Sequence, residues 1–399
     1  MSRILLRRSV GRPALLAATA VIAANTMLRK RQWVHEWLGA YFNFHFVLIF
    51  LGPLAAGLGA WEGARLARSR DLLQSSGQAR RALIGAAGAV FAWILGAYGA
   101  GLVGVTIMVK VAGTPGWPGL VDVATLVPAI AFLAMWVVVG TAAGYRFGSP
   151  LVAPLATVAS FTVILVLYIV DYDLVRVGGA SASLLGLAPY PIRQAAQTVL
   201  YLAAGAWSVL WATRPARSRS VDGSRISSAV AGGLALVLAA GLFLNNAPDF
   251  DQRPIKLECT GSPPICLAGG YAQYSERVRA ALSPLLAGLK EIGAPLPRAF
   301  RQELSEEDLV GTIPDELALG DQPSAVSAVI SAYSPLYACD VYRHPGLSEQ
   351  WDGLYEWLDS LLPEPALSGG PGAEAFRTGT KDEQAAWLRN AIDRLRRCA

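Results

Sequence analysis

Four cysteines carry the most readable chemistry in this chain of 399 residues, and all of them follow residue 245: Cys259, Cys266, Cys339 and Cys398. An even number of cysteines is typical of a domain that forms disulfides in an oxidising compartment. Cys259 and Cys266 flank a Gly-Ser-Pro-Pro turn, which favours a disulfide between them and leaves Cys339 to pair with Cys398. The alternative is that all four are reduced and buried as small apolar residues. A Cys-x6-Cys spacing without a matching histidine pair is a poor zinc site, so we predict no metal centre.

No motif in the sequence assigns a nucleophile and its base. The chain contains neither an H-E-x-x-H nor a G-x-S-x-G motif. It also lacks the G-x-x-x-x-G-K-[ST] phosphate loop, so we expect no ATP or other cofactor to be bound by this chain in the usual P-loop way. The region after residue 245 has one histidine, His344. An enzyme acting on envelope material would need a constellation around His344 that only folding could assemble.

Long apolar segments occupy the first 245 residues. A helix needs roughly 20 apolar residues to cross the hydrocarbon core of a bilayer. The seven segments are 13–28, 42–61, 83–109, 121–144, 150–170, 194–212 and 227–245. They predict a polytopic α-helical membrane protein with about seven transmembrane helices in residues 1–245. Residues 246–399 are long enough for one further domain. The first segment follows several arginines, and a cleaved signal peptide ending near 23–24 is its alternative interpretation.

Charge is divided unevenly between the two parts of the chain. Residues 1–245 hold 20 Lys and Arg against 7 Asp and Glu, whereas residues 246–399 hold 14 against 22. Most of the basic residues lie in short loops between apolar segments, which is the positive-inside pattern and not a nucleic-acid footprint. The pattern orients the N-terminus to the cytoplasm of a bacterial cell and the domain 246–399 to the outside. The cluster Arg29, Lys30 and Arg31 runs against this orientation.

The loop 62–82 has a helical pattern where a simple turn would connect two spans. It predicts a helix over 61–73 that leaves the bilayer, with Glu62 paired to Arg65 and with Arg65, Arg68 and Asp71 on one side. The alternative is that these arginines only extend toward the membrane surface from the end of a span.

Two features lie on the predicted outer side. The apolar loop 176–193 is too interrupted to span the bilayer, and it is either a re-entrant element or a loop packed under the domain 246–399. His45, beside Asn43 near the outer end of the second segment, is a candidate polar site, although a structural hydrogen-bonding role is the simpler interpretation. The glycines of the third segment suit close helix packing. They are Gly85, Gly88, Gly96, Gly99, Gly101 and Gly104.

The domain 246–399 combines short strands with amphipathic helices. Strands are expected at 255–259 and 264–267, around the proposed disulfide. A helix is expected at 272–292, with Val278, Leu282, Leu285, Leu286 and Leu289 on one stripe. Further helical patterns lie near 324–338, 348–361 and 382–397. The domain is therefore predicted to have an α+β fold.

The stretch from Gly52 to Arg65, followed by Arg68-Ser-Arg70-Asp71-Leu72-Leu73, resembles the second span and coupling helix of ABC-2-type exporter permeases of high-GC actinobacteria. The resemblance covers residues 1–212, and segment 227–245 with the domain 246–399 would be additions to a six-span core. It implies that Glu62, Arg65, Arg68, Arg70 and Asp71 contact a separate P-loop ATPase subunit, which binds ATP and Mg²⁺. It also implies pairing with a second copy or a second permease subunit, and it matches loop 176–193 to the re-entrant outer helices of that family.

A second hypothesis is that the membrane segments serve as an anchor for a sensor or binding protein. The acidic domain 246–399, with a net charge of −8 from 14 basic and 22 acidic residues, would then capture a cationic ligand or partner. In both hypotheses the chain is surrounded by membrane lipid.

Overall fold

The computed structural model describes most of the chain, in two compact units. The described ranges are 11–28, 34–169, 184–213, 250–303, 307–333, 345–363 and 380–397. Unit 1 comprises Met1–Val111 and Gly116–Arg253, and unit 2 comprises Ala112–Pro115 and Pro254–Ala399. The predicted segment 227–245, the residues Cys339, His344 and Cys398, and the cluster 29–31 lie outside the described residues.

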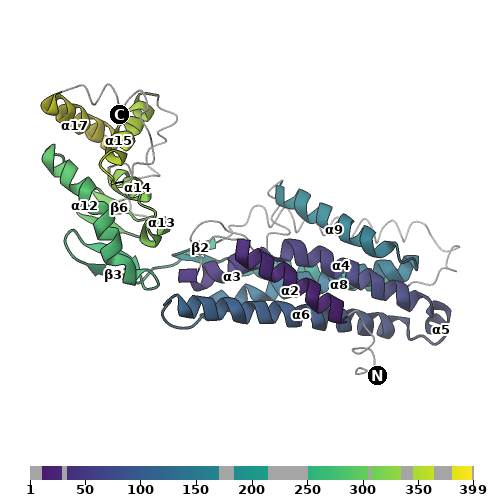
Figure 1. The fold of residues 1–399 in the computed structure, drawn as a ribbon. Helices are drawn as coiled ribbons and strands as arrows, with labels where there is room; N and C mark the ends of the chain where they lie inside the picture. The colour runs from purple at the N-terminus through teal and green to yellow at the C-terminus, as the bar shows by residue number, and fades with distance from the viewer. Residues whose placement is uncertain are drawn as a thin grey trace. The chain divides into compact units, whose positions relative to one another are not determined.

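Unit 1 is built of helices, most of them long and apolar (Figure 1). They are α2 (Gly11–Leu28), α3 (Trp37–His45), α4 (Leu48–Ala67), α5 (Arg70–Ser75), α6 (Ala79–Val111), α7 (Leu120–Ala124), α8 (Leu126–Phe147), α9 (Val152–Ile169) and α10 (Pro191–Ala212). By length and composition, four helical stretches of the described chain suffice to cross a membrane: α6, α7 with α8, α9, and α10. The pair α3 and α4, bent by 42°, makes a fifth if it is one span. The protein is therefore a polytopic helical protein compatible with a membrane, and α2, the first predicted span, is a shorter apolar helix.

Helix α4 lies at the centre of unit 1, and its closest neighbour is α8. The two helices meet backbone to backbone, because small residues face each other at the crossing. A Cβ atom added at Gly140 or Gly144 of α8 would overlap the carbonyl oxygens of Ala56 and Ala60, respectively. Reciprocally, a Cβ added at Gly59 or Gly63 of α4 would overlap carbonyl oxygens of α8. No side chain larger than hydrogen fits at these positions without moving a helix.

The glycines of α6 play a different part from the one that the sequence suggested. Only Gly101 among the six has a neighbour where its side chain would be, the side chains of Ile22 and Phe44. Positions 85, 88, 96, 99 and 104 have nothing within 4 Å among the described residues. Gly88, Ala92, Gly96, Ala100 and Gly104 recur every fourth residue and are all exposed. The close packing that glycine permits is therefore at the contact of α4 with α8, and the small face of α6 is open in this single chain.

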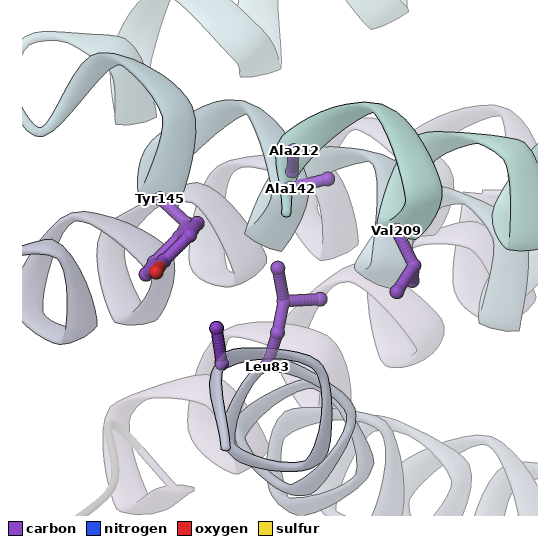
Figure 2. Close-up of a cluster of buried hydrophobic side chains, with 6 residues drawn as sticks. Leu83, Ala142, Tyr145, Val209 and Ala212 are labelled. Atoms are coloured by element: carbon purple, nitrogen blue, oxygen red, sulfur yellow. The ribbon is translucent and has the colours of Figure 1, made fainter. Parts of the chain in front are cut away.

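The helices of unit 1 converge at one end on a cluster of buried residues. Leu83 of α6 lies between Tyr145 and Ala142 of α8 and Val209 and Ala212 of α10 (Figure 2). Leu66, Ala67 and Leu73, from the end of α4 and from α5, pack against the same cluster. We call this end the arginine end of unit 1, because the loops that meet there carry Arg65, Arg68, Arg70, Arg80, Arg81 and Arg146.

A short antiparallel ladder closes the opposite end of unit 1. Strand β1 (Leu187–Pro189), just before α10, pairs with β2 (Phe250–Gln252), with Ala188 opposite Asp251. The described part of the predicted outer loop 176–193 is thus a strand followed by the start of α10.

Unit 2 has a sheet and a core of its own. Its elements are β3 (Leu257–Thr260), β4 (Ile265–Ala268), η3 (Ala272–Tyr274), α12 (Ser275–Glu291), β5 (Ala299–Arg301), β6 (Val310–Thr312), α13 (Asp315–Leu319), α14 (Ser324–Ser331), α15 (Pro345–Asp359) and α17 (Lys381–Arg397). The sheet has the order β3-β4-β5-β6, antiparallel between β3 and β4 and parallel beyond. Helix α12 buries the predicted stripe of Val278, Leu282, Leu285 and Leu289, whereas Leu286 is only half-buried.

The predicted hairpin of unit 2 is present, with its disulfide. Cys259 of β3 lies directly opposite Cys266 of β4, and the two sulfur atoms are bonded. An α+β fold holds for the described part of the unit. Helix α17 begins with a capping box, in which the Glu383 carboxylate accepts hydrogen bonds from the backbone and hydroxyl of Thr380. The backbone hydrogen bond from Thr380 lowers the pKa of Glu383 below its ordinary value, because it favours the ionised form.

We predict that Gly144→Ala destabilises the protein whereas Gly88→Ala does not. The added methyl group at position 144 would overlap the Ala60 carbonyl, while position 88 has free space. Overpacking of the kind expected at position 144 costs roughly 1–3 kcal/mol of stability. At an exposed helix position such as 88, alanine is instead more favourable than glycine by about 1 kcal/mol. The thermal unfolding midpoint of each variant in the same detergent tests this. Equal midpoints for the two variants would contradict a tight α4–α8 contact.

Candidate functional site

The candidate coupling loop at the arginine end is broken into two helices. Helix α4 continues to Ala67, so Glu62 and Arg65 share its last turns, and the predicted pair forms with 3.0 Å between Arg65 Nη1 and Glu62 Oε1. Arg68 and Ser69 separate α4 from α5. The predicted continuous helix over 61–73 is therefore wrong in this detail, and the three positions 65, 68 and 71 do not form one straight stripe.

Arg70, the first residue of α5, holds this helix to the end of α8. Its guanidinium donates hydrogen bonds to the carbonyl oxygens of Tyr145 and Arg146, the latter at 2.6 Å, and lies over the Tyr145 ring with 5.1 Å to the centroid. These carbonyls belong to the last turn of α8, where no further helical N–H is available to them. A positive charge is also favourable at the C-terminus of a helix. Arg70 therefore caps α8 and fastens α5 to it.

The remaining candidates of this loop point to a surface. Arg68 and Asp71 are exposed, and neither forms an ion pair within the described chain. Leu72, which follows Asp71 on α5, is 74% exposed, whereas its neighbour Leu73 packs inward on the buried cluster. The loop thus presents two charges of opposite sign, Arg68 and Asp71, and one large apolar side chain, Leu72. Arg70 holds the short helix α5 to the end of α8. This combination suits contact with another protein better than binding of a small ligand.

The two residues of the second candidate site, Asn43 and His45, lie in different surroundings. Both residues are in α3, but residues two apart on a helix do not face each other. His45 is 1% exposed and its ring stacks on Tyr98 at 6.3 Å, whereas Asn43 is half-buried. Both lie in the helix before α4, in the part of unit 1 away from the arginine end. The structure brings neither of them to the coupling loop.

Buried polar residues that the sequence analysis did not single out lie at the end of unit 1 where β1 pairs with β2, which we call the ladder end. Glu36 accepts a hydrogen bond from the Leu184 backbone at 2.9 Å, across 148 residues of chain. Asp122 accepts the Gly119 backbone N–H at 2.7 Å and lies 3.9 Å from Arg253, just after β2. These carboxylates fasten loops to one another, so their role is structural. A carboxylate followed by an apolar segment gives no sequence signal of such a distant partner.

Helix α10 carries a row of polar side chains on its buried face. Arg193, Gln197 and Tyr201 recur every fourth residue and are 5%, 4% and 2% exposed, respectively. The ring of Tyr201 packs edge-on against Phe132 of α8, with centroids 5.4 Å apart. The four-residue spacing could have revealed this row of polar side chains from the sequence, since it places all three on one face of the helix. In the described part of the chain, no group of three His, Cys, Asp or Glu could hold a metal ion.

Comparisons of the chain with protein-family models, with curated proteins and with solved structures found no match. The geometry and charge of the two ends of unit 1 are therefore what a functional proposal can use.

We predict that Arg70→Gln loosens α5 without unfolding unit 1. The variant loses the charged donor that caps α8, and a hydrogen bond to a charged group contributes roughly 1.5–3 kcal/mol. Backbone amides of 70–76 should then exchange with deuterium about tenfold faster or more. Hydrogen exchange read by mass spectrometry measures this, with Arg68→Gln as the matched control because Arg68 makes no such contact. Equal exchange in both variants would show that Arg70 does not hold α5.

Proposed function

We propose that the protein is the permease subunit of an ABC-type exporter, driven by a separate ATPase subunit. The observation that carries the proposal is the fastening of α5 to the end of α8 by Arg70. A force applied to α5 from outside the chain would pass directly to α8. Because α8 and α4 touch backbone to backbone, it would reach the central helix as well.

The surface of the coupling loop supports this proposal further. Arg65, Arg68, Asp71 and Leu72 are exposed on the loop, and they supply charge for orientation and an apolar anchor for affinity. Arg70 contributes by positioning α5. The nucleotide and Mg²⁺ would be bound by the partner, since the chain has no phosphate loop.

A second subunit is part of the proposal. A permease of about six spans works as a pair, either of two copies or with a second permease, around one transport path. The exposed face of α6, with small residues at every fourth position from 88 to 104, permits close approach of another helix. In this arrangement the loops of the arginine end face the cytoplasm and unit 2 lies outside.

The alternative proposal is a membrane-anchored sensor or binding protein. Its support is that unit 2 has its own buried core, its own sheet and a disulfide between Cys259 and Cys266. The 22 acidic against 14 basic residues, counted over 246–399, would attract a cationic ligand over long range.

Charge reversal at the coupling loop tests the leading proposal. Arg65→Glu with Arg68→Glu should reduce capture of a P-loop ATPase, in a mild-detergent pull-down from the native host, by about tenfold or more. The matched control is Arg80→Glu with Arg81→Glu, which makes the same charge change at the same end of unit 1. Capture should persist in the control. If the unaltered protein repeatedly captures no ATPase while it remains folded, the exporter proposal is wrong.

Removal of unit 2 separates the two proposals. The cut belongs after Arg253, because an earlier one would remove β2 and open the ladder with β1. An exporter core should still capture its ATPase after residues 254–399 are deleted. A sensor should lose its response to ligand, and it should show no ATPase before or after the deletion. The thermal midpoint of the truncated protein controls for loss of folding.

A further inference from the structure

One arginine at the arginine end is held in an unusual way. The guanidinium of Arg146, in the last turn of α8, lies over the indole ring of Trp211 near the end of α10, with 5.9 Å between the carbon and the ring centroid. Arginine stacks readily on aromatic faces, and its N–H groups stay available at the rim of the stack. The stacking therefore fixes the direction of the cation without using its hydrogen-bond donors.

Within the described part of the chain, no protein acceptor uses those donors. Arg146 forms neither an ion pair nor a side-chain hydrogen bond with any residue in the described ranges, although its side chain is half-buried. The hydrogen bond between Arg70 and Arg146 uses the backbone carbonyl of Arg146 and not its guanidinium. The guanidinium is thus a fixed, planar set of N–H donors, the geometry that matches the oxygens of a phosphate group.

The surroundings of this cation are apolar and exposed. Phe147, the next residue, is 66% exposed and its ring lies 6.1 Å from that of Trp211. Trp207 and Leu210 on the adjoining surface of α10 are 42% and 44% exposed. Because α10 is apolar and long enough to cross a membrane, this surface is one that lipid chains would cover. Tryptophan and arginine at the end of such a helix lie at the level of the lipid headgroups.

Charge at this end also favours an anion. Six arginines of the described chain lie here, against the acidic residues Glu62 and Asp71. One of these acids, Glu62, is already paired with Arg65. The surface potential at the arginine end is therefore positive and would select anionic lipids over zwitterionic ones.

We propose that Arg146, with Trp211 and Phe147, forms a binding site for the phosphate of an anionic phospholipid. The phosphate oxygens accept hydrogen bonds from the Arg146 guanidinium, and the acyl chains lie along Phe147, Trp207 and Leu210. Trp211 orients the cation. The site needs no ATPase partner to form, because all of its residues belong to α8 and α10, although Arg146 also accepts the Arg70 hydrogen bond through its backbone carbonyl.

The full-length protein in a neutral detergent tests the site. Binding of phosphatidylglycerol and of phosphatidylcholine with the same acyl chains is measured by native mass spectrometry. The unaltered protein should bind phosphatidylglycerol about fivefold more tightly, and Arg146→Gln should abolish that preference. Inorganic phosphate and glycerophosphate form a third arm. Binding of these as tight as that of the lipid would identify a soluble phosphate ligand and overturn the assignment to lipid.

Three further variants keep the result interpretable. Arg298→Gln removes an exposed arginine of unit 2 and should leave the preference unchanged. Trp211→Leu should reduce the preference, because it removes the ring that orients the guanidinium. Arg146→Lys keeps the charge but not the planar fork, so it should retain only part of the preference and serves if Arg146→Gln does not fold. Equal preference in Arg146→Gln and Arg298→Gln, or no preference in the unaltered protein, would overturn the proposal.

Discussion

The contact between α4 and α8 is the constraint on which the rest of unit 1 depends. At Gly59, Gly63, Gly140 and Gly144 the two helices touch through their backbones, and this close contact leaves them little freedom to rotate or slide. The other helices are then arranged around this pair. Helix α9 and helix α6 pack against α4, and α10 packs against α8. If unit 1 changes shape, we expect the surrounding helices to move relative to the α4–α8 pair, and we do not expect α4 and α8 to move relative to each other.

The two ends of this pair are fastened by different chemistry. At the arginine end, a cation caps α8 and holds the short helix α5, so the loop is bound through backbone carbonyls. At the ladder end, the carboxylates of Glu36 and Asp122 accept backbone N–H groups of distant or adjacent loops. Each arrangement matches the partial charge of the backbone groups that it meets, since carbonyl oxygens attract cations and N–H groups attract anions.

Much of the fold could be predicted from the sequence, because its strongest signals are local. Apolar runs locate the long helices, and the spacing of Val278, Leu282, Leu285 and Leu289 locates α12 and its buried face. The hairpin with Cys259 and Cys266 follows from a turn between two short strands. By contrast, β5 and β6 have three residues each and no pattern of their own, because they are fixed by pairing within the sheet.

The candidate site was less predictable, because its decisive contacts are with backbone atoms. The sequence identifies the charges of the coupling loop, but not that Arg70 differs from Arg68 by reaching carbonyl oxygens some 75 residues away. It also indicates where glycines are frequent, but not which of them face another helix. Gly140 and Gly144 are decisive for the α4–α8 contact, whereas the more numerous glycines of α6 mostly meet nothing within the described chain.

The ladder between β1 and β2 has a consequence for how the protein is made. Residues 187–189 are synthesised about sixty residues before their partners at 250–252, as the register of the ladder requires. During that interval the backbone groups of β1 lack their hydrogen-bond partners in β2, and Asp122 lacks its contact with Arg253. The nascent chain therefore completes unit 1 only when its last few residues emerge from the ribosome. Unit 2, apart from the loop 112–115, follows β2 along the chain, so its residues emerge from the ribosome after those that complete the ladder.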